Sequence, residues 1–244
     1  MNFFIKDKVA LVTGANLGIG LAIVHRLIKH GANKVYAAVR NTASTKTLEQ
    51  RYGDQVSTVY IDLSKPESIS ALAAECSDVD LVINNAGVLS LTGPLDPNAE
   101  TEFLKELEVN TLGPLRIAQT FTPILEKRKG AFVQLNSIAS IISGENLSTY
   151  SASKAASYSF TLALKESMGN KGIQVLSVHP GPIDTEMAAT GGFEDIAEPT
   201  SVVSEGIINS LANGDFLLFP DTMAREFYEA YLPYAKKYIT SQSQ

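Results

Sequence analysis

The sequence lacks most features that mark secreted, membrane-embedded or nucleic-acid-binding proteins. Cys76 is the only cysteine among 244 residues, so no intramolecular disulfide can form and a reducing compartment is expected. No stretch approaches the roughly 18 apolar residues of a transmembrane helix. The formal net charge of −6 disfavours nucleic acid and anionic membrane surfaces. We therefore expect neither nucleic acid nor a membrane as a main partner.

Targeting and metal-binding patterns are also missing. Residues 1–8 lack the long apolar run and the small-residue cleavage site of a signal peptide, so we expect a cytoplasmic protein. His25, His30 and His179 do not have the spacing of metal ligands. We expect all three histidines to be structural and no metal to be bound.

What the sequence does contain is enough apolar material for a sizeable core. Hydrophobic residues make up 45% of the chain and charged residues 19%, which argues against disorder. No repeat, low-complexity tract or linker divides the sequence. We therefore expect one domain over residues 1–244.

Short apolar runs alternate with longer amphipathic segments along the chain. The runs are rich in Val, Ile and Leu and are bounded by Gly, Pro, Asn or Asp, which predicts buried strands. The predicted strands are Val9–Thr13, Lys34–Val39, Val56–Ile61, Leu81–Asn84, Ala131–Leu135, Ile173–Val178 and Phe216–Phe219. The predicted helices are Gly18–His30, Pro66–Cys76, Thr101–Lys127, Thr149–Met168, Thr200–Ala212 and a last one after Asp221. This alternation predicts an α/β fold with a parallel sheet covered on both faces.

Two segments near the C-terminus have distinct patterns. Gly191 and Gly192, followed by Phe193 and several acids, predict a mobile loop. The segment Tyr228–Tyr238 carries four tyrosines, which is typical of a packed or subunit-facing helix.

A phenol and an ammonium lie four residues apart at Tyr150 and Lys154. On a helix this spacing places both side chains on one face. A nearby cation lowers the pKa of a phenol, so the pair is suited to proton exchange between a carbonyl and an alcohol. By itself the pair is equally compatible with an ordinary helix surface, and the other motifs supply the context.

A glycine-rich segment, Thr13–Gly20, joins the first predicted strand to the first predicted helix. Glycines let the backbone turn tightly and approach a pyrophosphate, which the helix N-terminus then favours. The spacing is Gly-x-x-x-Gly-x-Gly, with glycines at 14, 18 and 20. An ordinary strand–helix turn rarely needs three glycines, so the segment predicts a dinucleotide site.

The end of the second strand predicts which dinucleotide is bound. No acid stands there to accept the ribose hydroxyls of NAD, whereas Arg40 can pair with a 2′-phosphate. We therefore favour NADP(H) over NAD(H), although Arg40 is also compatible with a solvated arginine. Asp62 and Leu63 follow the third strand and are placed to contact adenine, but Asp62 is equally compatible with a cap on the helix near Pro66.

Two more motifs lie where ligands of open α/β sheets bind. Asn84–Gly87 ends the fourth strand, where its asparagines can hold backbone groups and its small residues allow close approach. Pro114 lies inside a helical pattern and has no N–H for the carbonyl of Asn110. We expect a kink that leaves this carbonyl free to bind a water.

Together these motifs resemble the short-chain dehydrogenase/reductase family, as a carbonyl reductase-like member, over nearly the whole chain. The matching segments are Thr13–Gly20, Asn84–Gly87, Asn110, Ser137, Tyr150-x-x-x-Lys154 and Pro180–Thr185. The resemblance implies a single-domain Rossmann-type doubly wound sheet of seven strands in the order 3-2-1-4-5-6-7. It also implies a catalytic tetrad of Asn110, Ser137, Tyr150 and Lys154.

The family's roles transfer to these positions. Tyr150 would protonate the carbonyl oxygen, and Ser137 would hydrogen-bond the same oxygen. Lys154 would lower the pKa of Tyr150 and bind the nicotinamide ribose, while Asn110 would hold a water in a relay to Lys154.

The resemblance also implies the ligand contacts. The residues expected at the cofactor are Gly14, Asn16, Leu17, Gly18, Ile19, Gly20, Arg40, Asp62, Leu63, Asn85, Ala86, Gly87, Tyr150, Lys154, Pro180, Gly181, Ile183 and Thr185. The residues expected at the substrate are Ser137, Ile138, Leu147, Tyr150 and Met187, with Leu89, Ile183 and Phe193 as further lining. The short stretch at about 186–200 implies a small substrate loop and an open pocket. Asn16 and Leu17 stand where NADP(H)-preferring relatives often carry a basic residue, and Asn136 stands where many have a second serine.

Three functions are compatible with the sequence. The leading one is NADP(H)-dependent reduction of small or medium ketones or aldehydes. The second is reduction of a 3-oxoacyl thioester, with Lys127–Lys129 and Lys171 guiding an acyl carrier. The third is a non-enzymatic NADP(H)-sensing protein, which would have no reason to keep Ser137, Tyr150 and Lys154 together. The resemblance further implies a homodimer or homotetramer formed through the helices near Thr101–Lys127 and Thr149–Met168.

Overall fold

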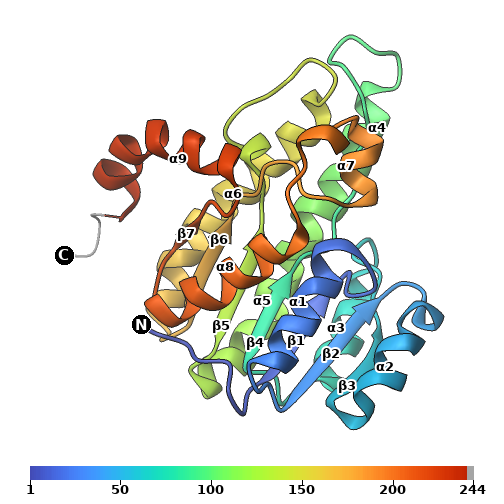
Figure 1. Cartoon of the computed structure of the whole chain (residues 1–244), viewed down its shortest axis with the longest axis vertical. Coiled ribbons are helices and arrows are strands. Elements are labelled where there is room, and N and C mark those ends of the chain that lie inside the picture. Colours follow the sequence, from blue (N-terminus) through green and yellow to red (C-terminus); the bar gives the residue numbers. More distant parts are fainter. Residues whose placement is uncertain (241–244) are drawn as a thin grey trace.

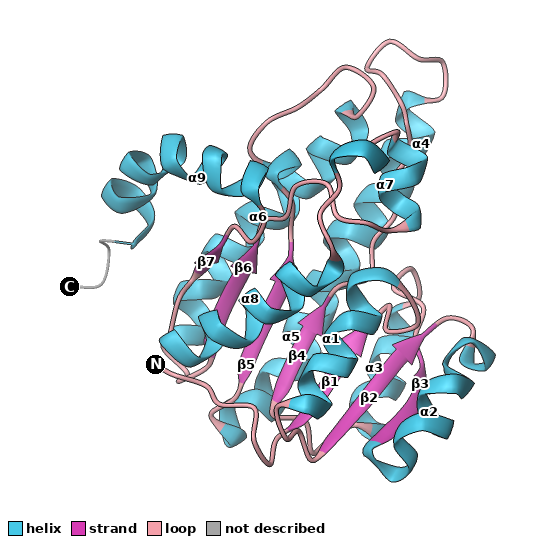
Figure 2. Ribbon diagram, in the orientation of Figure 1, coloured by secondary structure: helices cyan, strands magenta, loops and turns pink. Residues whose placement is uncertain are grey.

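A seven-stranded parallel sheet forms the middle layer of the molecule (Figure 2). The computed structural model describes residues 1–240. The strands are β1 Val9–Thr13, β2 Lys34–Val39, β3 Val56–Tyr60, β4 Leu81–Asn84, β5 Ala131–Leu135, β6 Gln174–Val178 and β7 Leu217–Leu218. Their order is β3-β2-β1-β4-β5-β6-β7, which confirms the predicted fold class and strand order. The order reverses between β1 and β4, so a crevice opens between the segments that follow these two strands.

Helices cover both faces of the sheet (Figure 1). The helices are α1 Gly18–Lys29, α2 Lys46–Tyr52, α3 Pro66–Glu75, α4 Ala99–Leu107, α5 Gly113–Arg128, α6 Ser148–Gly169, α7 Glu186–Gly191, α8 Thr200–Asn213 and α9 Thr222–Ala235. One face packs against α1, α2 and α8, and the other packs against α3, α5 and α6.

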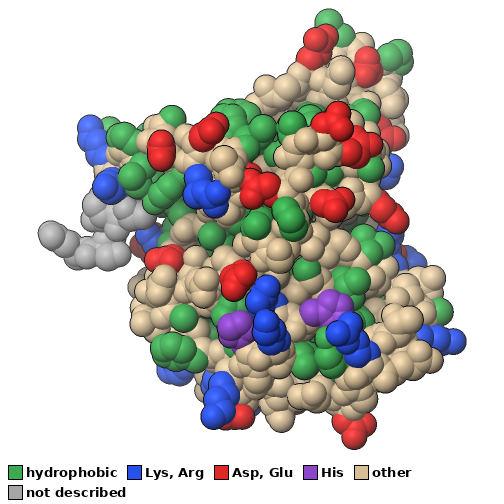
Figure 3. Space-filling model, in the orientation of Figure 1, with side chains coloured by type: hydrophobic (Ala, Val, Ile, Leu, Met, Phe, Trp, Pro, Cys, Tyr) green, Lys and Arg blue, Asp and Glu red, His purple; other side chains and the backbone are tan. Residues whose placement is uncertain are grey.

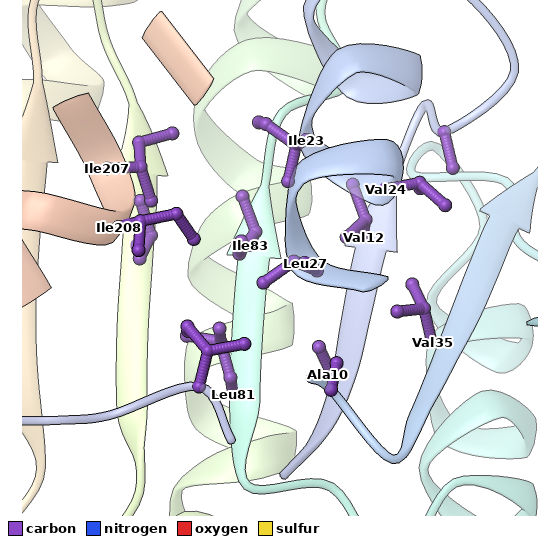
Figure 4. Packing of buried hydrophobic residues seen from close by; sticks show 14 of the residues in the cluster. Ala10, Val12, Ile23, Val24, Leu27, Val35, Leu81, Ile83, Ile207 and Ile208 are labelled. Carbon is purple, nitrogen blue, oxygen red and sulfur yellow. The ribbon is translucent and has the colours of Figure 1, made fainter. Parts of the chain in front are cut away.

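Alternating residues of a strand contribute to the two layers of the core, because successive side chains point to opposite faces of the sheet. Ala10 and Val12 of β1 belong to the layer that includes Leu27 of α1 (Figure 4). Leu11, between them, packs in the opposite layer with Phe121 of α5. Every residue of β1 is buried, which explains its continuous apolar run.

The segment predicted as one helix over Thr101–Lys127 is interrupted, as Pro114 predicted. A π-helical turn, Glu108–Leu112, separates α4 from α5, and the Gly113 N–H bonds the Glu108 carbonyl five residues back. Pro114 lies in the first turn of α5, where its missing N–H has no helical partner to lose. The interruption is therefore a local widening of the helix, and the water on the Asn110 carbonyl stays a prediction.

Two helices, α2 and α7, were not predicted from the sequence. The second of them lies in a segment that was predicted to be a loop. Residues 186–200 were expected as a small substrate loop, with a mobile loop starting at Gly191 and Gly192, whereas α7 occupies Glu186–Gly191 and a 3-10 turn occupies Glu194–Ile196. The Thr185 hydroxyl caps α7 by accepting the Ala188 N–H at 3.3 Å. The other missed helix, α2, is short and largely polar, and it buries only Leu48.

The last helix, α9, extends from the carboxyl end of β7 away from α1 and α2 (Figure 1). Asp221 caps it by accepting the Ala224 N–H at 2.9 Å. Tyr228 and Tyr231 pack against Phe219, whereas Tyr234 is 55% exposed. The tyrosine-rich segment is therefore packed on one face, where Ala235 is also fully buried, and exposed at Tyr234.

Among residues 1–240, no helix combines the length and the apolar character that crossing a membrane requires.

Candidate active site

A cavity of about 730 Å³ lies at the carboxyl edge of the sheet. Its lining comes from the segments that follow β1 to β6 and from α6, α7 and α9. All residues expected at the cofactor and the substrate line it except Gly20, and Asn110 does not line it either. One cavity therefore brings together motifs that are far apart in the sequence.

The glycine-rich segment forms a cradle with no room for side chains. Gly14 and Gly18 have φ angles of +65° and +53°, which L-residues rarely adopt. A Cβ atom on Gly20 would lie 2.1 Å from the Gly14 carbonyl oxygen. Close approach of backbone N–H groups at the start of α1 suits a pyrophosphate, so these residues fit a dinucleotide.

Hydrogen bonds hold the Asn84–Gly87 segment against the end of β1. The Asn85 side-chain amide donates to the carbonyls of Thr13 and Gly14 at 3.0 and 3.2 Å. The Thr13 hydroxyl accepts the N–H groups of Asn85 and Ala86, both at 3.0 Å. These bonds fix the two loops that flank the crevice, as the asparagines predicted.

Arg40 and Asp62 lie together at the end of the cavity that follows β2 and β3. Arg40 is exposed, and its charge helps to lower the pKa of Asp62, after the larger effect of hydrogen bonds from Ser64. Asp62 accepts the Ser64 N–H at 3.0 Å and the Ser64 hydroxyl at 2.7 Å. The alternative that Asp62 caps the helix at Pro66 is therefore wrong, because its carboxylate holds the preceding turn.

Tyr150 and Lys154 lie on one face of α6, as their spacing predicted, and both are buried. The Lys154 Nζ donates to the Leu135 carbonyl at the end of β5 at 2.9 Å, and lies 5.8 Å from the Tyr150 ring centroid. Burial lowers the pKa of Lys154 to about 8.

The lowering of the Tyr150 pKa that was expected from Lys154 is not seen in this structure. Burial raises the pKa of Tyr150 to about 12, the Ser137 hydroxyl opposes this rise, and the charge of Glu106 adds to it. The Lys154 ammonium is turned toward Leu135 at the sheet edge, so it does not offset the desolvation of the phenol. Tyr150 is therefore a protonated phenol throughout the neutral range.

Ser137 stands directly after β5 and is held by the neighbouring turn. Its hydroxyl accepts the Ala139 N–H at 3.1 Å and donates to the Pro180 carbonyl at 3.3 Å. His179 is fully buried behind it, with Nδ1 lying 3.2 Å from the Ser137 carbonyl and Nε2 lying 2.8 Å from the Ser177 hydroxyl. Burial lowers the pKa of His179 to about 3, so this imidazole is neutral.

The Asn110 side chain holds the loop behind the cavity. It accepts the Val88 N–H at 2.9 Å and donates to the Val88 carbonyl at 2.8 Å and to Ser153 at 3.0 Å. A Cβ atom on Gly87 would lie 3.1 Å from Asn110 Oδ1 and 3.7 Å from Lys154 Nζ. The Asn110 side chain is thus engaged by the protein itself. The predicted water relay would therefore use the Asn110 backbone carbonyl, the atom that the sequence analysis named.

Thr185 is engaged within its own segment. Its hydroxyl donates to the Ile183 carbonyl at 3.0 Å, and a Cβ atom on Gly18 would lie 2.9 Å from its methyl group. Thr185 thus packs over the glycine cradle, between the cofactor end and α7.

Sequence reasoning missed part of the lining. The additional apolar residues include Ile142, Ile196, Met223 and Phe227. Met223 and Phe227 have the spacing of one helix face, which was visible in the sequence. Their place beside the cavity depends on Asp221, which accepts the Gly181 N–H at 2.8 Å as well as capping α9.

The basic residues considered for guiding an acyl carrier lie at the wrong edge of the sheet. Arg128 is the last residue of α5 and bonds Asp80, just before β4, at 2.8 Å. Lys171 precedes β6 and pairs with Glu126 at 2.9 Å. Both lie at the amino ends of the strands, opposite the cavity, so the expected guiding role is not supported.

Comparisons with known proteins agree with this geometry. A family model described as short chain dehydrogenase matches residues 8–192. A 3-oxoacyl-[acyl-carrier-protein] reductase of Chlamydia muridarum is 32% identical, over 80% of this chain and 81% of that protein. Estradiol 17-beta-dehydrogenase 2 of Rattus norvegicus is 31% identical, over 76% of this chain and 51% of that protein. A structure from Burkholderia cenocepacia, in complex with NADP, has a TM-score of 0.85 at 29% identity, covering 98% of this chain and 100% of that one.

Proposed function

The chain belongs to the short-chain dehydrogenase family, an oxidoreductase family acting on alcohol and carbonyl groups with NAD(P)(H), and we propose that it reduces ketones or aldehydes reversibly with NADP(H). The observation that carries this proposal is the meeting of Tyr150 and Ser137 in the cavity that the glycine cradle bounds. A proton donor and a hydrogen-bond donor thus lie where a carbonyl can face the cofactor.

Tyr150 is the general acid of the proposed reaction. Burial keeps its phenol protonated at neutral pH, so it can donate a proton to a carbonyl oxygen during reduction. The Ser137 hydroxyl shares the same side of the cavity and stabilises the charge that develops on that oxygen. When bound, the nicotinamide cofactor supplies the hydride.

Lys154 and Asn110 complete the proposed proton path. Lys154 has a pKa of about 8, so its ammonium exchanges protons near neutral pH more readily than an exposed lysine does. Asn110 fixes the Val88 segment beside it and offers its backbone carbonyl to a water. We infer that protons return to Tyr150 by this route after each turnover.

The preference for NADP(H) rests on Arg40. Its exposed guanidinium lies at the end of β2, where it can pair with a 2′-phosphate. The NADP held by the Burkholderia cenocepacia protein supports this choice.

The two alternatives make different demands on the cavity. Reduction of a carrier-bound 3-oxoacyl group is supported by the Chlamydia muridarum relative, whereas the position of Arg128 and Lys171 speaks against it. A non-enzymatic sensor is disfavoured by the family, whose members are oxidoreductases.

We further propose one domain over residues 1–244, with a small substrate segment at about 186–200. A homodimer or homotetramer would form through α4 and α5, which follow β4, and through α6, which follows β5.

The test is the loss of reduced-cofactor absorbance with a panel of ketones and aldehydes. Turnover with NADPH is expected, at least about tenfold better than with NADH, and Tyr150→Phe should reduce kcat at least about 100-fold. Turnover with NADH alone would overturn the cofactor proposal and leave the chemistry standing. Activity on carrier-bound but not free ketones would favour the first alternative, and tight NADPH binding without any turnover would favour the second.

A further inference from the structure

We propose that the substrate of this enzyme is an uncharged, largely apolar carbonyl compound, and that Met223 and Phe227 of α9 form the wall that selects it. This inference rests on the proposed function and specifies its substrate class. It excludes keto acids and phosphorylated carriers.

Two of the three charged residues that line the cavity lie away from the reacting groups. Among residues 1–240, only Arg40, Asp62 and Lys154 line the cavity with charged side chains. Arg40 follows β2 and Asp62 follows β3, which lie three and four strands from β5 and its Ser137. At about 4.8 Å per strand, the separation is roughly 14 to 19 Å. Lys154 Nζ is directed at the Leu135 carbonyl.

The lining around Ser137 and Tyr150 is largely apolar instead, with Asn136, Ser143 and Ser151 as its other polar members. Ile138, next to Ser137, packs in one hydrophobic cluster with Met223 and Phe227. The other apolar lining residues at this end are Leu89, Ile142, Leu147, Met187, Phe193 and Ile196. A carboxylate held among such residues loses its hydration without gaining a partner, which is costly.

The position of α9 against the cavity is set by hydrogen bonds. The buried Asp221 accepts the Gly181 N–H at 2.8 Å through one oxygen and the Ala224 N–H at 2.9 Å through the other. The same carboxylate thus joins the Pro180–Thr185 segment to the first turn of α9. Arg225, between the two wall residues, does not line the cavity and bonds the Pro220 carbonyl and the Thr222 hydroxyl.

The segments that bound this end are acidic. Residues 180–199 contain five Asp or Glu, residues 88–102 contain three and residues 138–149 contain one, and none of these segments contains Lys, Arg or His. Figure 3 shows acidic side chains gathered over the upper part of this view, where α4 and α7 lie. Such a field disfavours the approach of anionic substrates and of acidic carrier proteins.

The test compares two aryl ketones that differ in charge at the far end of the ring. Methyl 4-acetylbenzoate and 4-acetylbenzoic acid are assayed as substrates with NADPH, and as inhibitors of the ketone that the panel shows to be reduced fastest. We expect kcat/KM and the inhibition constant to favour the ester by at least about 100-fold, because the acid must bury an unpaired carboxylate. Equal values for ester and acid would overturn this inference and leave the proposed function intact. Absence of turnover with every ketone would overturn the proposed function itself.

Two variants separate the contribution of charge from that of shape. Ile142 lines the cavity and is 44% exposed, so Ile142→Arg places a cation at this end without burying it fully. It should raise kcat/KM for the acid relative to the ester at least about tenfold. Failure of this variant to favour the acid, in a folded protein that still reduces the ester, would contradict the charge argument.

The second variant, Phe227→Ala, removes part of the apolar wall. It should raise KM for the ester about tenfold while changing kcat by less than about twofold, because the lost contacts are made equally in the bound state and the transition state. Tyr234→Ala is the matched control, an aromatic truncation on the same helix outside the cavity lining, and its KM should match the wild type. An unchanged KM in Phe227→Ala would remove α9 from the selecting wall.

Discussion

The two edges of the parallel sheet differ in whether a buried charge has a partner of opposite charge. At the amino edge, the buried Asp80 carboxylate accepts the Val9 N–H at 2.9 Å and bonds Arg128 at 2.8 Å, with Lys8 at 4.0 Å. At the carboxyl edge, the buried Lys154 ammonium donates to the Leu135 carbonyl, and no carboxylate within residues 1–240 forms an ion pair with it. The paired charge stabilises the fold, whereas the unpaired one is buried at a cost in stability, as expected of a group with the proposed role in proton transfer.

Buried polar atoms without partners follow the same division. Considering residues 1–240, six buried side-chain atoms have no hydrogen-bond partner, and five of them belong to residues near the carboxyl ends of the strands or beside Tyr150. Those five atoms are Asn84 Oδ1, Glu106 Oε2, Asn136 Oδ1, Thr149 Oγ1 and Ser151 Oγ. Functional sites concentrate such unsatisfied groups, while structural regions avoid them.

Lys154→Met, which removes the unpaired charge at the carboxyl edge, is expected to have the largest effect on activity. Removing the ammonium should lower kcat by about 100-fold or more, because the proton path through Lys154 is lost. The same change should raise the free energy of unfolding at pH 7 by about 1–2 kcal/mol, since it removes a buried charge at the cost of one hydrogen bond. Thermal unfolding and steady-state kinetics of the two proteins check both expectations. A lower melting temperature would contradict the idea that Lys154 is destabilising.

Asp80→Ala tests the opposite edge. It leaves the Val9 N–H and the Arg128 guanidinium without their buried partner, so the free energy of unfolding should fall by about 3 kcal/mol. The kcat of the folded enzyme should stay within about twofold, because Asp80 lies at the far edge from the cavity. Urea unfolding and kinetics at low temperature measure the two effects separately. A loss of kcat with unchanged stability would reverse the roles assigned to the two edges.

Arg40→Ser adds to this comparison an exposed charge, at the rim of the cavity. The kcat/KM for NADPH should fall about tenfold, because a charge-assisted contact to the 2′-phosphate is lost, while the value for NADH should change little. Arg51→Ser removes an exposed arginine from α2, outside the cavity lining, and serves as control. Equal losses with both cofactors would indicate a structural effect and not phosphate recognition.

The last prediction concerns the pH dependence of stability. The Lys154 pKa is about 8 in the folded protein and about 10.5 when unfolded, so the unfolded chain binds more protons in that window. Stability from this group therefore rises as pH increases from 8 to 10.5, and the advantage of Lys154→Met should shrink over the same range. Urea midpoints of both proteins at several pH values would show it. A constant difference would mean that another group is responsible.

The sheet could be predicted from the sequence more completely than the site. The β1 and β2 strands match their predicted bounds because each contains an apolar run, with only Thr13 and Lys34 as polar residues at their ends, and a run buried on both faces has few alternatives. The short helix α7 escaped prediction because its start depends on the Thr185 cap and its segment is rich in small residues. The sequence located the interruption at Pro114, but not the π-helical form that it takes.

The electrostatics of the site were harder to predict than its members. The spacing of Tyr150 and Lys154 placed both on one helix face, yet the direction of the pKa shift at Tyr150 depends on burial and on the hydrogen bond of Lys154 to another strand. The four-residue spacing of Met223 and Phe227 was enough to predict that they share one helix face. Their position at the cavity depends on Asp221 contacts with Gly181, 40 residues earlier in the chain.

The burial of the single cysteine makes the chain convenient for site-directed labelling. Cys76 is fully buried at the end of α3, and burial raises the pKa of its thiol to about 12. Thiolate is the reactive form, so thiol reagents should leave the native protein unmodified. A cysteine introduced at the exposed Tyr234 would then be the one reactive position, and a fluorophore there would report how α9 moves as ligands enter and leave.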